Sequence, residues 1–280
     1  MSVLSSVSAR PARATSFLSR DQLLAGLLIV ASANGLVSRV LINLPFAGLY
    51  DPFGISLIVW GGWACACYLI LRDDRGEPAT GLDLIYASIL LLLVASPGPH
   101  LSWAVVFILA VYVICTTPPD AAQRKAAMIF LTLTVPMFWG PLSFNVAARP
   151  LLEIDAFLVG KIIGTEQIGN TVKFADGVHF FQVWPGCSSF HNISQAAVAW
   201  MTLSQTLGRR WNLHDMIWCV LAGLAAMVVN LGRLSLIGLY REHFDSIHGS
   251  PGSEIAGLLA LVAILLVCII GLRREIFQQV

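Results

Sequence analysis

Long runs of apolar residues constrain this chain more than any other feature of its sequence. There are eight of them, covering residues 22–44, 54–71, 82–95, 101–115, 126–144, 188–207, 215–240 and 252–272. A helix needs about 20 apolar residues to cross the hydrocarbon core of a bilayer. The runs therefore predict an all-α polytopic membrane protein with about eight transmembrane helices, built as a single integral membrane domain over residues 1–280. The third and fourth runs are short, and a tilted or re-entrant hairpin is an alternative for that pair.

The supply of charged residues excludes several other classes of protein. Charged residues make up 12% of the chain, hydrophobic residues make up 57%, and the mean hydropathy is +0.77. A soluble domain carries roughly 25% charged residues to cover its surface in water. The formal net charge of +1 leaves no basic surplus to neutralise phosphates. A soluble enzyme, a disordered tail and a nucleic-acid binder are therefore excluded.

The basic residues predict the orientation of the spans. If residues 1–21 are a cytoplasmic tail, eleven Lys and Arg side chains fall in inner segments and four in outer ones. Cytoplasmic loops attract Lys and Arg, so we expect both termini inside. The first run also resembles a cleavable signal peptide, because Ala31, Ser32 and Ala33 follow Arg20 and a short apolar stretch. The apolar character continues to residue 44, which favours an uncleaved first span.

The longest connection, residues 145–186, then lies outside the cell membrane. Apolar residues recur at helical spacing over 151–163 with charged residues between them, which predicts an amphipathic helix on the membrane surface. Residues 165–183 alternate in hydropathy around Gly169-Asn170 and Asp176-Gly177. That pattern is typical of short strands joined by tight turns. We expect a small helix and a β-hairpin in this extracytoplasmic insertion, and a plain capping loop is the alternative.

One of the six cysteines stands apart from the rest. Cys187 follows Pro185-Gly186 and lies at the expected start of the sixth helix, whereas the other five lie in or at the end of apolar runs. The N–H groups and the positive dipole end of a helix start stabilise a thiolate, which is the nucleophilic form of cysteine. Cys187 is therefore a candidate nucleophile, and an inert helix cap is the alternative.

An arginine inside a predicted span is the second candidate. Arg233 lies seven residues before the outer end of its run, about 10 Å below that end at 1.5 Å per residue. An Arg at the centre of a membrane helix costs about 2.5–3.5 kcal/mol on insertion scales, so it normally faces the bundle interior. Asn230 is one turn away and is a possible hydrogen-bond partner. Arg39 is a weaker case nearer the end of its span, and a snorkelling side chain is the alternative for both.

Several histidines are candidates to partner the thiol. His248 lies in the short outer segment before the last span, and His191 is four residues after Cys187 on the same helical face. His179 and His243 are also in predicted outer segments. A histidine near a thiol can accept its proton and later protonate a leaving amine. Spacing does not choose among the four.

Together these residues carry a resemblance to a known family. A strand, then Pro-Gly-Cys-Ser at a helix start, then Asn-x-x-Arg late in a span, then His-x-x-x-Gly before a last span resembles the exosortase/archaeosortase family. The resemblance covers about residues 172–257. By position, Cys187 matches the family's nucleophile, Arg233 its arginine and His248 its histidine. Ser189 departs from the family's usual pattern, which has glycine there.

The resemblance implies a function. It implies a thiol protease and transpeptidase of the bacterial inner membrane that cleaves C-terminal sorting signals of secreted proteins at the outer face, through an acyl-enzyme thioester. Its partners would be secreted proteins ending in a short motif, an apolar span and a basic tail, within the lipid bilayer. No metal or organic cofactor is implied. The alternative is a non-enzymatic transporter or assembly factor for surface polysaccharide, in which Arg39 and Arg233 line a path for an anionic substrate.

Overall fold

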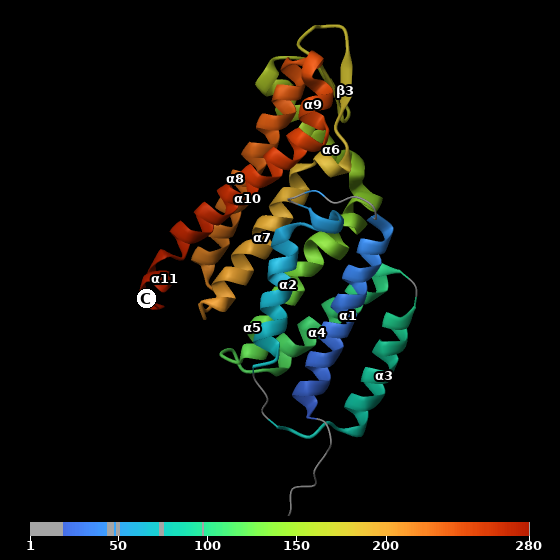
Figure 1. Ribbon diagram of the computed structural model, residues 1–280, viewed down its shortest axis with the longest axis vertical. Coiled ribbons are helices and arrows are strands. Elements are labelled where there is room, and N and C mark those ends of the chain that lie inside the picture. The colour runs from blue at the N-terminus through green and yellow to red at the C-terminus, as the bar shows by residue number, and fades with distance from the viewer. Residues whose placement is uncertain (1–18, 44–47, 49–50, 73–75, 97, 280) are drawn as a thin grey trace, which may run out of the picture.

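The computed structural model describes residues 19–43, 48, 51–72, 76–96 and 98–279. Within these residues the chain is an elongated helical bundle with a small sheet at one end (Figure 1). Its α-helices are α1 (Arg20–Asn43), α2 (Leu57–Ile70), α3 (Gly81–Ala95), α4 (Pro99–Thr116), α5 (Ala122–Thr134), α6 (Gly140–Ile163), α7 (Ser189–Thr206), α8 (Leu213–Leu239), α9 (Phe244–His248), α10 (Ser250–Gly271) and α11 (Arg273–Gln279). The predicted cytoplasmic tail, residues 1–21, lies mostly outside the described residues.

Five helical segments of the described chain are long and apolar enough to cross a membrane. They are Arg20–Ile42, Pro99–Thr116, Ala122–Ile163, Leu213–Leu239 and Ser250–Gly271. The helices α2 and α3 are apolar but shorter. The all-α, membrane-embedded character of the protein is thus confirmed, while the count of eight spans stays a prediction.

Of the three apolar runs that are not among these five segments, two form the short helices α2 and α3, and the third forms α7. The helix α7 packs against α2, α5, α8 and α10, so it runs through the middle of the bundle. Its buried residues include the polar side chains Ser194, Gln195, Ser204 and Gln205. A helix that is covered by protein rather than lipid can bury polar groups when they find partners.

The cleavage site of the alternative signal peptide lies inside a continuous helix. Ala31 and Ser32 are fully buried in α1. The Ser32 hydroxyl donates to Leu28 O at 2.7 Å and accepts from Trp63 Nε1 on α2 at 2.9 Å. The second bond ties α1 to α2.

The helical structure that begins in the fifth apolar run continues past the end of that run. A π-helical turn, η2 (Val135–Trp139), joins α5 to α6, and α6 continues to Ile163 with non-helical torsion angles at Ala147. The predicted amphipathic helix is the second half of α6. It buries Leu152, Asp155, Ala156 and Val159. This half packs against α8 and β2, so the helix has protein on its buried side.

The predicted strands and turns are confirmed, but they form a three-stranded sheet where a β-hairpin was expected. β1 (Gln167–Ile168), β2 (Thr171–Lys173) and β3 (Phe180–Gln182) form an antiparallel sheet in the order β1-β2-β3. Val172 lies opposite Phe181, and the turns use Gly169 at φ 60° and Gly177 at φ 73°. Positive φ is a conformation that glycine adopts at little cost. After β3 the chain passes through the short 3-10 turn η3 (Pro185–Cys187) and enters α7.

The end of the bundle away from the sheet is held by ion pairs. Arg210 pairs with Asp120 at 2.8 Å, and Arg209 pairs with Asp215 at 2.8 Å and Glu275 at 2.9 Å. These contacts join the α4–α5, α7–α8 and α10–α11 connections at the end opposite β3 and α9 (Figure 1). The described basic residues Arg209 and Arg210, which are predicted to be cytoplasmic, therefore lie at the end of the molecule away from the sheet.

Candidate functional site

Cys187 lies where the sheet meets the central helix. It is the last residue of η3, directly before Ser188, which caps α7 by accepting from Phe190 N at 3.2 Å. Pro185 fixes the first position of the turn, and Cys187 N donates to Trp184 O at 2.8 Å. The side chain is 8% exposed. The predicted placement of the thiol at a helix start is confirmed.

His248 is the histidine that the fold brings to this thiol. Its Nε2 lies 3.6 Å from Cys187 Sγ. His248 is the last residue of α9, and its ring stacks on Phe244 with centroids 5.0 Å apart and planes 7° apart. The stacking orients the imidazole, and the contact distance suits a hydrogen bond to sulfur. Geometry thus chooses among histidines that spacing left open.

The other three histidines point to different partners. His191 Nε2 lies 2.7 Å from Gln195 Nε2 within α7. His179 Nδ1 pairs with Asp176 at 2.7 Å in the β2–β3 turn. His243 lies in η4 (Arg241–His243), with its ring near Tyr240. Each is therefore engaged elsewhere in the described chain.

Arg233 holds the segment that carries His248. Its Nε donates to Ile247 O and its Nη2 donates to His248 O, both at 3.2 Å. Carbonyl groups at the C-terminus of a helix lack partners within that helix, so a guanidinium there also meets the negative end of the dipole. Arg233 thus fixes α9, and with it the imidazole. The Arg233 side chain is partly buried and faces protein carbonyl groups.

Asn230 has a different partner from the one expected. The sequence suggested that it bonds Arg233, but its Nδ2 donates to Cys187 O at 2.8 Å and Ser189 Oγ at 3.1 Å. Asn230 is buried in α8. Ser189, the residue that departs from the family pattern, is therefore part of a bond that ties the start of α7 to α8.

Asp155 is a site residue that sequence reasoning missed. It is 2% exposed, and its Oδ2 accepts from Ser188 Oγ and from Ser189 N, both at 2.9 Å. The carboxylate thereby caps α7 from α6. The sequence did contain a signal for Asp155, because this residue shares a helical face with the apolar residues Leu152 and Val159. A carboxylate on a buried face needs hydrogen-bond donors from within the protein.

The backbone N–H groups around Cys187 already have acceptors inside the protein. Cys187 N bonds Trp184 O, Ser188 N bonds Pro185 O, and His191 N bonds Ser188 O. Ser189 N and Phe190 N are taken by Asp155 and Ser188. The expectation that N–H groups at the helix start stabilise a thiolate directly therefore needs correction. The nearest polar group able to stabilise negative charge on sulfur is His248.

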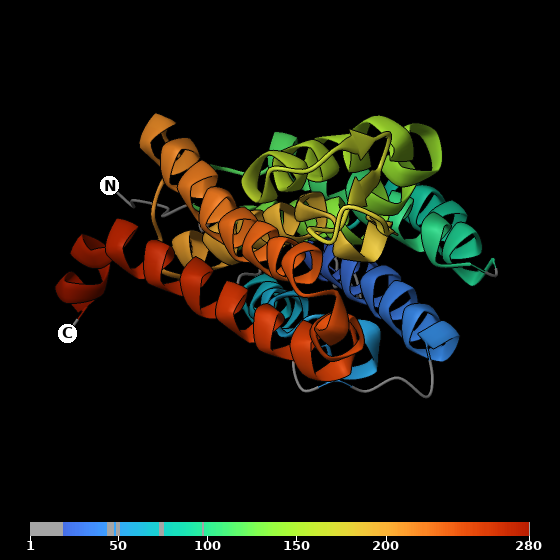
Figure 2. The same ribbon diagram turned by 90° about the horizontal axis from the view of Figure 1, so that it is seen from above.

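An aromatic pocket of about 420 Å³ opens beside His248. Its lining residues come mainly from the sheet region and the η4–α9 segment. These two parts of the backbone lie at the same end of the molecule, which Figure 2 shows from above. The lining residues are Phe174, Phe180, Phe181, Gln182, Trp184, Arg241, Phe244 and His248. Arg241 Nη1 lies 3.7 Å from Asp176. The pocket thus offers mostly aromatic surface with one imidazole at its wall.

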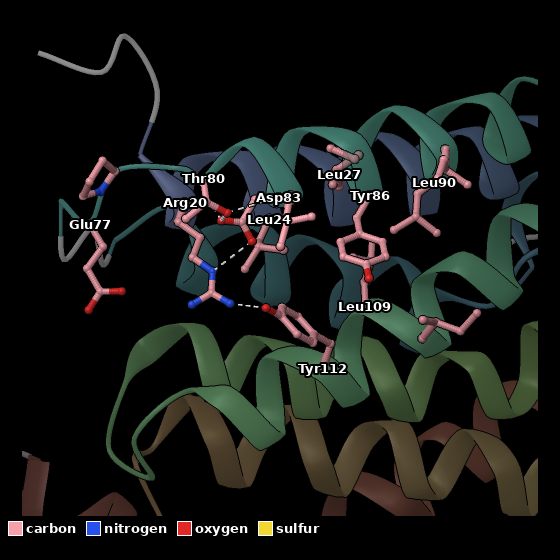
Figure 3. Close-up of a pocket in the computed structure, with 15 residues that line it drawn as sticks. Arg20, Leu24, Leu27, Glu77, Thr80, Asp83, Tyr86, Leu90, Leu109 and Tyr112 are labelled. Carbon is pink, nitrogen blue, oxygen red and sulfur yellow. Dashed lines mark hydrogen bonds and ion pairs between the residues drawn. The ribbon is translucent and has the colours of Figure 1, made fainter.

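A larger cavity of about 670 Å³ lies at the opposite end, between α1, α3 and α4 (Figure 3). Among its polar groups, Arg20 Nε lies 3.3 Å from Asp83 and Arg20 Nη2 donates to the Tyr112 hydroxyl. Leu24, Leu90 and other apolar side chains form the rest of its wall. Among the described residues that line it there is no cysteine or histidine. Among the described residues no group of three or more His, Cys, Asp or Glu side chains is arranged to hold a metal ion.

Comparison with known proteins adds no relative: no family model, curated protein or solved structure matches the chain.

Proposed function

We propose that this protein is a membrane cysteine peptidase and transpeptidase of the exosortase type. One observation carries the proposal: Cys187 Sγ lies 3.6 Å from His248 Nε2 at the end of the bundle where the sheet meets α7. A thiol and an imidazole at this distance form the nucleophile and base of covalent acyl transfer. The motifs that resemble the family contribute both side chains, and they lie far apart in the sequence.

The reaction balances with these two groups alone. His248 Nε2 takes the thiol proton as Cys187 Sγ bonds to the scissile carbonyl carbon. The tetrahedral intermediate collapses when His248 returns that proton to the leaving nitrogen, which breaks the C–N bond and leaves a thioester. An amine acceptor or water then attacks the thioester and gives its proton to His248. Release of the product regenerates the thiol.

Arg233 supports the reaction in two ways. Through Ile247 O and His248 O it fixes the backbone that carries the base. Its guanidinium has five N–H donors, so it retains donors for the carbonyl oxygen that becomes negative in the intermediate. The N–H groups of residues 187–191 are used inside the protein, which makes the guanidinium the better candidate for this role.

The proposed substrates are secreted proteins held by a C-terminal transmembrane helix, cleaved at the extracytoplasmic face. In support, the site is at the opposite end of the bundle from the basic segments, which favour the cytoplasmic side. A reacting group at the membrane surface can reach the first residues outside a partner's span. The acceptor can be an amine or water.

The test is cleavage of a co-expressed substrate in a bacterial host. Candidate substrates are proteins of the same genome that end in a short shared motif, one apolar span and an Arg-rich tail, fitted with an epitope tag on each side of the motif. We expect the wild type to release the C-terminal tag and Cys187→Ala to abolish release. Cys115→Ala is the matched control, because Cys115 lies at the far end of α4 and is exposed.

Two results would count against the proposal. Release of the tag by Cys187→Ala at the wild-type rate would show that Cys187 is not the nucleophile. Loss of function on changing Arg39 or Arg233, with Cys187→Ala and Cys187→Ser fully tolerated, would favour the transporter or assembly factor instead.

A further inference from the structure

The strand β3 has a free edge. It is the last strand of the sheet order β1-β2-β3, so in the described chain it has a strand partner on one side only. Phe174 N donates to His179 O, and Val183 N donates to Asn170 O. Hydrogen-bonded pairs alternate along an antiparallel ladder. The backbone groups of Phe180 and Gln182 therefore point away from β2, toward the free edge.

The aromatic pocket runs along this edge. Successive side chains of a strand point to opposite faces of the sheet. Both Phe181, which is buried in the core, and its neighbours Phe180 and Gln182 line the pocket. Because residues from both faces of the sheet border the pocket, the pocket lies beside the edge of β3 and not over one face of the sheet. The other wall of the pocket is Arg241, Phe244 and His248.

The edge leads directly to the reacting sulfur. Only Val183 and Trp184 separate β3 from the turn that ends in Cys187. Trp184 has extended torsion angles, so the strand direction continues to the turn, and its exposed indole lines the pocket. A chain lying along β3 thus passes the aromatic side chains and arrives at His248 and Cys187.

We propose that the substrate is bound as an extended polypeptide that adds a strand to the free edge of β3 and places one bulky apolar side chain in the aromatic pocket. This rests on the proposed function, because it names the binding mode of the same site. Strand addition supplies main-chain hydrogen bonds for affinity and pockets for alternate side chains for specificity. The free N–H and C=O groups of Phe180 and Gln182 complement a peptide backbone. They would be left without partners against an acyl chain.

The probe is a set of peptide chloromethyl ketones reacting with the full-length protein in detergent micelles. The thiolate of Cys187 displaces chloride and forms a thioether, and mass spectrometry counts modification at this residue. The parent is Ac-Ala-Phe-Ala-CH₂Cl, with Ac-Ala-Ala-Ala-CH₂Cl and two analogues N-methylated at Phe or at the following Ala. Iodoacetamide, which has no peptide, reports the reactivity of the thiol itself, so each peptide rate is expressed relative to it.

We expect the Phe peptide to react at least about tenfold faster than the all-Ala peptide, since burial of a Phe side chain contributes about 1.5–3 kcal/mol. One N-methyl analogue should lose most of the advantage while the other keeps it, because only alternate N–H groups face a partner strand. Trp184→Ala should reduce the preference for Phe. Gln182→Pro removes an edge N–H and leaves the bonds to β2, so it should lower the peptide rate below that of the reference Gln182→Ala, which keeps the N–H.

Each failure has its own signature. Equal relative rates for the Phe, Ala and both N-methylated peptides, with Cys187 modified normally by iodoacetamide, overturn the strand-addition proposal and leave the proposed function standing. Absence of modification at Cys187 by any reagent overturns the proposed function, and this inference with it. If Gln182→Pro fails to fold, the N-methylated peptides decide the question on the wild-type protein.

Discussion

Removal of the Asp155 carboxylate tests the idea that α6 anchors the start of α7. Asp155 Oδ2 accepts two hydrogen bonds at 2.9 Å, from Ser188 Oγ and Ser189 N, in a position that is 2% exposed. Asp155→Asn keeps an oxygen that can accept both bonds but removes its charge. Asp155→Ala removes the acceptor and leaves both donors buried without it.

The magnitudes follow from the type of bond. A hydrogen bond to a charged group contributes about 1.5–3 kcal/mol and a neutral one about 0.5–1.5 kcal/mol. Two bonds that change from charged to neutral therefore cost about 2 kcal/mol in Asp155→Asn. Complete loss of both in Asp155→Ala costs about 3–6 kcal/mol. In a chain of this size 1 kcal/mol shifts Tm by about 2–4 °C, so Asp155→Asn should lower Tm by roughly 4–8 °C and Asp155→Ala by more.

Thermal unfolding in detergent, followed by intrinsic Trp fluorescence, measures this series, and iodoacetamide modification of Cys187 reports the position of the thiol. The matched control is Glu153→Gln on the same helix, because Glu153 pairs with the largely exposed Arg149 and such a pair contributes little. If both Asp155 variants melt within about 1 °C of the parent and Cys187 reacts at its usual rate, the carboxylate is not an anchor.

Three further outcomes are expected. Arg233→Lys should lower the rate of Cys187 modification by the Phe peptide about tenfold without unfolding the protein, because a point ammonium cannot bridge two carbonyl groups as a planar fork does; a parent-like rate would contradict this role. Gly238→Ala places a Cβ 2.7 Å from the Ile163 side chain on α6 and should lower the free energy of unfolding by about 1–3 kcal/mol. The control is Gly232→Ala on the same helix, whose Cβ meets nothing within 4 Å and should not destabilise the protein. Burial and the nearby Glu254 raise the pKa of Asp51 to about 6. The folded state thus binds a proton that the unfolded state releases, so stability falls as pH rises from about 4 to 6, and Asp51→Asn should raise Tm at pH 8 more than at pH 4; an equal shift at both pH values would refute it.

The sequence was sufficient where local chemistry decides structure. Gly169 and Gly177 marked the turns of the sheet, and Pro185-Gly186 marked the break before α7. The apolar runs predicted most helices, because membrane-embedded segments must satisfy their backbone internally. The amphipathic pattern over 151–163 predicted the second half of α6.

The rest depends on contacts between distant segments. His248 meets Cys187 because α9 folds back between α8 and α10, and no spacing between residues 187 and 248 encodes that return. Asn230 was assigned to its helical neighbour Arg233, but its Nδ2 donates to Cys187 O in the η3 turn before α7. Hydropathy predicted a span for α7, although helices surround it and reduce its need for apolar residues.

The burial of Cys187 also affects how readily its thiol is oxidised. Thiols persist in the reducing cytosol but are converted to disulfides in oxidising compartments such as the bacterial periplasm. All six cysteines are free, and Cys187, at 8% exposure, presents little surface to a dissolved oxidant or to another protein's thiol. Susceptibility to oxidation follows accessibility as well as thiolate character. In the proposed function, where Cys187 acts as a nucleophile outside the cytosol, this burial would protect the thiol between turnovers.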